Sequence, residues 1–195
     1  PSNGVKPLWR STRVIYPSAR RAGKTVDVTG ASLPGTPAMI VGSNGSIAWG
    51  FTNSYADSVD WVRVAFDPEH PDRYRTSDGM QPIEKHAETI HVHGAADETL
   101  DVEDTIWGPI LAKDADGTPL ALAWTAQQPG AFNFELQNLE TAETADEGVS
   151  IAQNAGVPPQ NIVIGDRAGH IAWTIAGRLP HRIGAYDPQL PADFS

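Results

Sequence analysis

The sequence predicts an α+β fold that is predominantly antiparallel β with few helices. Short runs of apolar and β-branched residues recur along the chain between turn signals, a pattern typical of antiparallel strands. Only one region, between Ala131 and Asn154, is rich in the Glu, Ala, Leu and Gln residues that favour helices. This order of elements indicates a sheet protein with a minor helical part.

The expected strands follow one another along the whole chain. They fall in the segments 8–17, 23–32, 38–41, 47–51, 60–66, 88–94, 98–104, 108–114, 118–126, 160–166 and 170–177. Three pairs of them are predicted to be hairpins, with turns at Gly42-Ser43-Asn44-Gly45, at Asp116-Gly117 and at Arg167–Gly169. In the first turn, the Asn-Gly pair is expected to supply the positive φ angles that a tight turn requires.

We expect one or two helices between Ala131 and Asn154, with a break near Gly148. The sequence Asn154-Ala155-Gly156 is a suitable C-terminal cap for the last of them.

The bulk properties limit the classes of function. With 195 residues, the chain is long enough for a single domain, 1–195, with its own core. A net charge of −10 disfavours nucleic acid and anionic lipid as partners, since both are negatively charged. The absence of cysteine excludes disulfides, zinc–thiolate sites and cysteine nucleophiles. No apolar run is long enough to span a membrane, and the N-terminal residues lack the pattern of a signal peptide.

The strongest candidate for a cation site is the loop Asp57-Ser58-Val59-Asp60. Two carboxylates three residues apart, with a backbone carbonyl between them, suit a hard cation that takes six to eight oxygen ligands. The loop alone cannot complete such a site, and turn capping by the two aspartates is the alternative interpretation.

Two further patterns are weaker. His91 and His93 would share one face of a strand and could bind a metal, or they could simply belong to an exposed edge strand. Thr52-Asn53 follows a strand containing Gly50, and such a strand end can present a backbone N–H to an oxyanion.

Taken together, these segments resemble the penicillin acylase (penicillin amidase) family of N-terminal-nucleophile hydrolases. The stretch TGASLPGTPAMIVGSNGSIAWGFTNSYADSVDWVRV follows that family's order of an L-P-G-x-P turn, an apolar strand, G-x-N, I-x-W-G and an Asp-x-Val-Asp-like loop. The segments IWGPILAKDADGTPLALAWTA and QNIVIGDRAGHIAWTIAGRLPHR are similar to later motifs. The resemblance runs from about Leu8 to Pro191.

The resemblance implies an αββα fold and a role as a central part of a β subunit. Members of the family are precursors that cleave themselves into an α and a β chain, and the new N-terminal serine of the β chain attacks an amide through an acyl-enzyme. The implied substrates are small N-acyl compounds such as β-lactam side chains, acyl-homoserine lactones or lipopeptides. The implied partners are the α chain and the remainder of the β chain, and the implied location of the parent protein is periplasmic or secreted.

The resemblance also assigns roles to individual residues. Asn53 would donate its backbone N–H to the oxyanion, and Val41 and Phe51 would line the acyl pocket. A structural Ca²⁺ would be bound by Asp57, Asp60 and the carbonyls of Val59 and Pro188. Ser2 is not expected to be the nucleophile, because Pro1 precedes it. The nucleophile and the second oxyanion donor are expected outside the 195 residues, so the isolated chain is expected to be inactive.

Two alternatives from other classes remain open at this point. One is a non-catalytic, β-rich binding module that kept the strands of the family. The other is a calcium-stabilised structural domain with no substrate.

Overall fold

The computed structural model describes residues 12–21, 24–33, 36, 38–184, 187 and 189–194. They belong to two compact units, one formed by residues 1–57 and 129–179 and the other by residues 58–128 and 180–195. Whether the two units form the single domain over 1–195 that the sequence predicts is not settled by this division, so the single domain stays a prediction. Ser2 and Pro188 lie outside the described residues.

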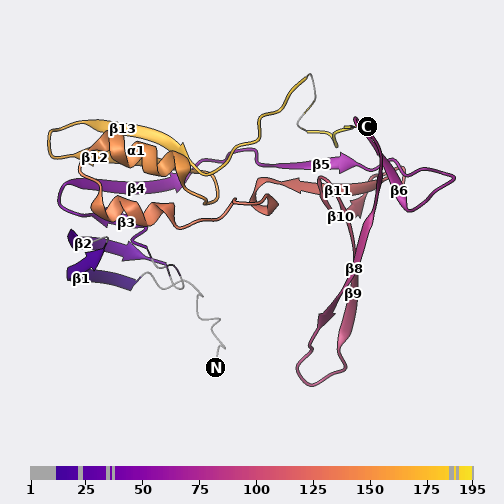
Figure 1. Ribbon diagram of the computed structural model, residues 1–195, viewed down its shortest axis with the longest axis horizontal. Helices are drawn as coiled ribbons and strands as arrows, with labels where there is room; N and C mark the ends of the chain where they lie inside the picture. The colour runs from indigo at the N-terminus through magenta and orange to yellow at the C-terminus, as the bar shows by residue number, and fades with distance from the viewer. Residues whose placement is uncertain are drawn as a thin grey trace, which may run out of the picture. The chain divides into compact units, whose positions relative to one another are not determined.

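The first unit is built on a six-stranded antiparallel sheet with the strand order β1-β2-β3-β4-β12-β13 (Figure 1). Its strands are β1 Thr12–Arg21, β2 Lys24–Ser32, β3 Val41–Ser43, β4 Ile47–Asn53, β12 Gln160–Asp166 and β13 Ile171–Ala176. The neighbour of β4 on one side is β12, more than 100 residues later in the chain, in a seven-pair register from Ile47↔Asp166 to Asn53↔Gln160.

Two helices pack on this sheet, the 3₁₀ helix η2 (Glu135–Thr141) and α1 (Ala145–Asn154). α1 contacts β12 and β13, and η2 contacts β2. The helices and the sheet share one core, in which side chains at alternate positions of the strands are buried, as expected for a sheet covered on one face. The largest fully buried side chains of this core are Met39, Ile47, Leu139, Ile162 and Ile164.

The turn between β3 and β4 forms at the predicted place. Gly45 has a φ of 83°, which favours glycine. Asn44 does not share this backbone conformation, because Tyr55 is the one described non-glycine residue with a positive φ. Instead, the Asn44 side chain accepts hydrogen bonds from the N–H groups of Ser46 and Ile47 and donates to the carbonyls of Leu139 and Ala142. Asn44 therefore ties the turn to the end of η2.

The predicted break in the helical region is wrong in position. The chain leaves the helical conformation at Ala142 and starts α1 after Thr144, whose side chain accepts the N–H of Glu147. Gly148 lies inside α1, where a Cβ atom would come within 2.9 Å of Ile164 Cδ1. The C-cap is Ala155 in an extended conformation, so Gly156 does not end the helix by a left-handed turn.

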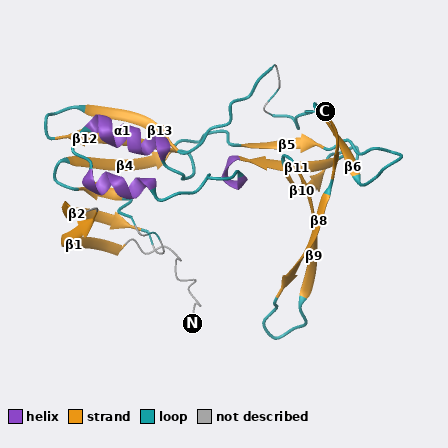
Figure 2. Ribbon diagram, in the orientation of Figure 1, coloured by secondary structure: helices purple, strands orange, loops and turns teal. Residues whose placement is uncertain are grey.

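The second unit contains a five-stranded sheet with the order β5-β11-β10-β9-β8 and a two-stranded sheet of β6 and β7. Its elements are β5 Val59–Arg63, β6 Arg73–Thr76, β7 Gly79–Pro82, β8 Glu84–Ile90, β9 Glu98–Thr105, β10 Gly108–Lys113, β11 Pro119–Trp124 and the 3₁₀ helix η1 Thr125–Gln127. Figure 2 shows β8 and β9 as one long hairpin, and every residue of β8 is exposed. The core of this unit is formed by Val62, Val64, Tyr74, Ile83 and Ala121.

Most predicted strands are confirmed, and so are the hairpins at Gly117 and Gly169. The strand predicted over 88–94 ends at Ile90, and the β6–β7 hairpin was not predicted, although Asp78-Gly79 is a turn signal. Among the described residues, no helix is both long and apolar enough to cross a membrane.

Candidate functional site

The C-terminal end of β4 presents backbone groups on the side where β3 no longer pairs with it. The Ile47 carbonyl accepts the N–H of Asn44, so the polar backbone groups of Ile47 point toward β3. In an antiparallel strand these groups alternate in direction, which puts the N–H of Asn53 on the same side as that of Ile47. The register of β3 with β4 ends at Gly42↔Trp49, four residues before Asn53. By this alternation the Asn53 N–H points beyond the end of the ladder, while its carbonyl, at the last residue of the strand, accepts from Asn161 of β12.

The side chain of Asn53 has a local structural role. Its Oδ1 accepts the N–H of Tyr55 at 3.0 Å, and Tyr55 adopts a φ of 50° and is exposed. The Asn53 carbonyl accepts a hydrogen bond from Asn161 Nδ2 at 3.2 Å. These contacts fix the place where the chain leaves the sheet and leave the residue itself exposed.

Val41 and Phe51 lie on neighbouring strands but on opposite faces of the sheet. Residues directly opposite in the register share a face, so Gly42 lies on the face of Trp49, which is buried under the helices. Phe51 is two residues from Trp49 and packs against the same core, whereas Val41 lies next to Gly42 and therefore on the other face. Their assignment to an acyl pocket stays a prediction.

The face of this sheet away from the helices exposes large apolar side chains. Val163 pairs with Gly50 on β4 and with Trp173 on β13, so these residues share one face of the sheet. The buried Trp49 and Ile164 lie on the other face. Val163, Ile171 and Trp173 have exposed fractions of 48%, 80% and 61%. We call these three residues the apolar sheet face.

Two of the four candidate calcium ligands, Val59 and Asp60, have other contacts in the structure. Val59 is the first residue of β5 and pairs with Trp124. Asp60 forms an ion pair with Arg182, whose Nε lies 3.0 Å from Oδ2 and 3.2 Å from Oδ1. In the described part of the chain, no three His, Asp or Glu side chains are grouped so that they could hold a metal ion. The Asp60 carboxylate is thus already bound to a cationic side chain, and the assignment of a calcium ion to this loop stays a prediction.

The two histidines of His91-Val92-His93 do not share a strand face. They follow the end of β8 in the loop of the hairpin, because β8 and β9 stop pairing at Ile90↔Glu98. His91 contacts the carboxylate of Asp97 across this loop at 2.8 Å, and both side chains are exposed. The interpretation of these residues as parts of an edge strand is wrong.

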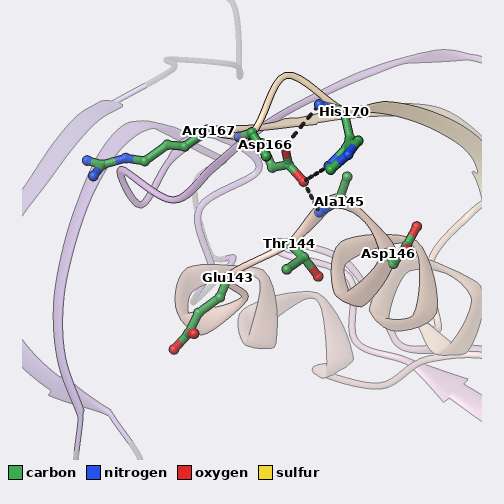
Figure 3. A pocket seen from close by; sticks show the side chains of 8 residues that line it. Glu143, Thr144, Ala145, Asp146, Asp166, Arg167 and His170 are labelled. Atoms are coloured by element: carbon green, nitrogen blue, oxygen red, sulfur yellow. Dashed lines mark hydrogen bonds and ion pairs between the residues drawn. The ribbon is translucent and has the colours of Figure 1, made fainter.

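A pocket of about 350 Å³, not predicted from the sequence, lies where the β12–β13 turn meets the start of α1, and most of the residues that line it are polar or charged (Figure 3). Asp166 occupies its centre and accepts hydrogen bonds from the N–H groups of Ala145, Ala168 and His170 and from the His170 ring. Burial raises the pKa of Asp166, but the bonds from Ala145 and His170 outweigh this effect and lower it to about 2. The signal for this contact was the Thr144-x-x-Glu147 motif, which marks a helix start.

The model of the Penicillin amidase family matches residues 6–195, nearly the whole chain. The chain belongs to the penicillin amidase family. This confirms the resemblance drawn from the motifs between Leu8 and Pro191.

The curated relatives of this penicillin amidase chain are acylases that are named after different substrates. It is 30% identical to a penicillin G acylase of Escherichia coli over 203 residues, which is 97% of this chain and 22% of that protein. It is 25% identical to the acyl-homoserine lactone acylase QuiP of Pseudomonas aeruginosa, over 90% of this chain and 21% of that protein. It is 27% identical to aculeacin-A acylase of Actinoplanes utahensis, over 95% of this chain and 24% of that protein. The chain thus spans about a fifth of the length of these relatives.

A solved structure of a thermostable penicillin G acylase from Alcaligenes faecalis shows the same fold. It has a TM-score of 0.78 and 24% identity, and the match covers 96% of this chain and 33% of that one. The predominantly antiparallel fold with few helices is therefore confirmed.

Proposed function

We propose that this chain is a central part of the β subunit of an amidohydrolase that cleaves small N-acyl substrates through a serine acyl-enzyme. The observation that carries the proposal is the match of the penicillin amidase family to residues 6–195, joined to relatives that are all named as acylases. β-Lactam side chains, acyl-homoserine lactones and lipopeptides are the candidate substrate classes.

The geometry of β4 supports a role for Asn53 as one oxyanion donor. A backbone N–H that points beyond the end of its ladder can be aimed at a substrate carbonyl. The seven-pair register with β12 holds β4 in the sheet, and a donor preorganised in this way stabilises the negative charge that develops on a carbonyl oxygen.

The reaction requires groups that the proposal places outside the 195 residues. The Oγ of an N-terminal serine would attack the acyl carbonyl carbon while its proton passes to the serine's own α-amine. The collapse of the tetrahedral intermediate would then break the C–N bond and give the proton to the leaving amine. Water would hydrolyse the resulting ester by the same route, releasing the acid and restoring the serine hydroxyl.

The apolar sheet face supports a location within a larger β subunit. Three large apolar side chains that remain exposed on one sheet face are typical of a surface that another part of the protein covers. The proposed partners are the remainder of the β chain and an α chain from the same precursor. One relative, from Pseudomonas sp. strain SE83, is named penicillin acylase 2 proenzyme. It is 27% identical to this chain over 86% of the chain's length.

The test uses the full-length protein and a panel of N-acyl substrates that differ in acyl group. The expected result is amide hydrolysis, with a covalent adduct of acyl mass on an N-terminal serine detected by intact-protein mass spectrometry. Asn53→Pro removes the backbone N–H, and Asn53→Ala keeps it while removing the side chain. We expect Asn53→Pro to lower kcat about 100-fold or more relative to Asn53→Ala.

Circular dichroism and thermal unfolding of both variants separate a loss of catalysis from a loss of folding. A folded full-length protein with no amide hydrolysis on any substrate would favour the non-catalytic binding module. Equal kcat values for the two folded variants would exclude Asn53 as an oxyanion donor.

A further inference from the structure

The carboxylate of Asp60 is already neutralised by a residue of this chain. Arg182 donates from Nε to Oδ1 and Oδ2, at 3.2 and 3.0 Å, and from Nη2 to Oδ1 at 3.1 Å. Both oxygens of Asp60 therefore accept N–H groups from one guanidinium. The exposed fractions of the two side chains are only 14% for Asp60 and 23% for Arg182.

The two partners are held in place by their backbones. Asp60 belongs to β5 and pairs with Ala123 of β11, so the strand ladder fixes its backbone. The chain beyond Arg182 returns to the same strand, because Ala192 donates its N–H to the Trp61 carbonyl and its own carbonyl accepts the N–H of Arg63. The segment that carries Arg182 is thus anchored beside β5 on its C-terminal side.

A calcium ion and Arg182 compete for the same oxygens. Calcium needs six to eight oxygen ligands at 2.3 to 2.6 Å, and both oxygens of the Asp60 carboxylate already accept N–H groups from arginine in three contacts. A dication bound to Asp60 would also lie within a few ångströms of a guanidinium that stays charged at all relevant pH values. The pair is screened little by water, since both side chains are mostly buried.

We propose that Arg182 takes the place of a calcium ion at this loop and makes the strand connection before β5 independent of divalent cations. The bidentate guanidinium supplies both the positive charge and the directional bonds that a metal would otherwise give to Asp60. This inference does not rest on the proposed catalytic function, because it concerns the counter-charge of Asp60 alone.

The experiment measures calcium content and thermal unfolding of the full-length protein, in EDTA and in millimolar calcium chloride. We expect the parent protein to unfold at the same temperature in both solutions. Arg182→Gln should unfold at a lower temperature in EDTA and recover part of the loss in calcium, with calcium binding at least about tenfold tighter than in the parent because the competing charge is gone.

Two further variants make the result specific. Arg182→Lys keeps the charge and should stay insensitive to calcium, whereas the added calcium response of Arg182→Gln should disappear when Asp60→Asn is combined with it. Lys85→Gln removes another ion pair, that of Lys85 Nζ with Glu103 Oε1 at 2.6 Å, and serves as the matched control that gains no calcium response.

Two results would overturn the inference. One is a parent protein whose unfolding temperature falls in EDTA, with Asp60→Asn abolishing that dependence. The other is a folded Arg182→Gln that shows no calcium response. If Arg182→Gln does not fold, the responses of the parent and of Arg182→Lys to EDTA decide the question.

Discussion

The carboxylate of Asp166 accepts the backbone N–H of Ala145, 21 residues earlier, at 3.2 Å. Asp166 is the last residue of β12 and Ala145 is the first residue of α1. One carboxylate thus joins the start of the helix to the hairpin on which the helix packs, and it also lies close to the positive end of the helix dipole.

This contact predicts a loss of stability in acid. The pKa of Asp166 is lowered to about 2 in the folded protein, against about 3.9 in an unfolded chain. A carboxyl group whose pKa is lower in the folded protein stabilises the fold fully at pH values above its pKa in the unfolded chain. This stabilisation is lost as the pH falls from about 4 toward 2. Asp166→Asn should therefore be less stable than the parent at neutral pH, and the gap should narrow below about pH 4. Urea unfolding of both proteins across this range measures the gap, and Asp146→Asn, in the first turn of α1, is the control.

Asn44 is predicted to be one of the most sensitive polar positions of the first unit. Its side chain makes four hydrogen bonds, to Ser46, Ile47, Leu139 and Ala142, at 2.7 to 3.0 Å. Asn44→Ala should cost about 2–4 kcal/mol of unfolding free energy, since part-buried backbone groups lose their partners. Asn138→Ala removes an exposed side-chain amide that donates to Glu135 Oε1. This change should lower the free energy of unfolding by less than about 0.5 kcal/mol. Equal costs in denaturant titrations would show that the turn does not depend on Asn44.

Gly148 tests whether packing or helix propensity dominates in α1. Alanine would favour the helix by about 1 kcal/mol, but its Cβ would lie 2.9 Å from Ile164 Cδ1 and 3.1 Å from Ile164 Cγ2. We expect the cost of overpacking, about 1–3 kcal/mol, to exceed the gain in helix propensity, so that Gly148→Ala lowers the melting temperature. Ile164→Val removes the Cδ1 atom and should recover part of the loss in the double variant. Ser150→Ala, on the exposed side of the same helix, should be neutral or slightly stabilising.

The acyl-pocket assignment predicts changes in substrate preference. Val41→Ala should change the ratio of kcat/KM between long and short acyl groups by about tenfold or more, since each methylene of fit counts for about 1–3 kcal/mol. Phe51→Leu should mainly lower stability, because Phe51 packs against the core on the opposite face of the sheet from Val41. Val102→Ala, on β9 in the second unit, is the control. If Val41→Ala leaves the ratio unchanged, Val41 does not line the pocket.

Local signals predicted much of this fold. The hairpin turns at Gly45, Gly117 and Gly169 were found because glycine is needed where φ is positive. β12 was predicted with its observed bounds, since its alternating pattern is bounded by a proline pair and a turn. The same kind of reasoning failed at Gly148, because a glycine chosen for close packing against Ile164 looks like a helix breaker when only the sequence is seen.

Contacts between distant residues could not be predicted in this way. Asp60 and Arg182 are 122 residues apart, and the Asp60 loop alone favoured a cation or a turn cap. The bonds from Asn44 to Leu139 and Ala142 span 95 and 98 residues. Only the family resemblance carried long-range information, and it did so through the order of motifs along the chain.

The pairing of β4 with β12 has a consequence for the newly made chain. Asn53 and Gln160 are the two partners nearest in sequence, and 107 residues separate them. At synthesis rates of about 5–20 residues per second, β4 leaves the ribosome roughly 5–20 seconds before its partner strand exists. During that interval its edge, with Trp49 and Phe51, is available for incorrect pairing with other chains. Slower translation before residue 160 or the lack of a holding chaperone should therefore reduce the yield of this protein.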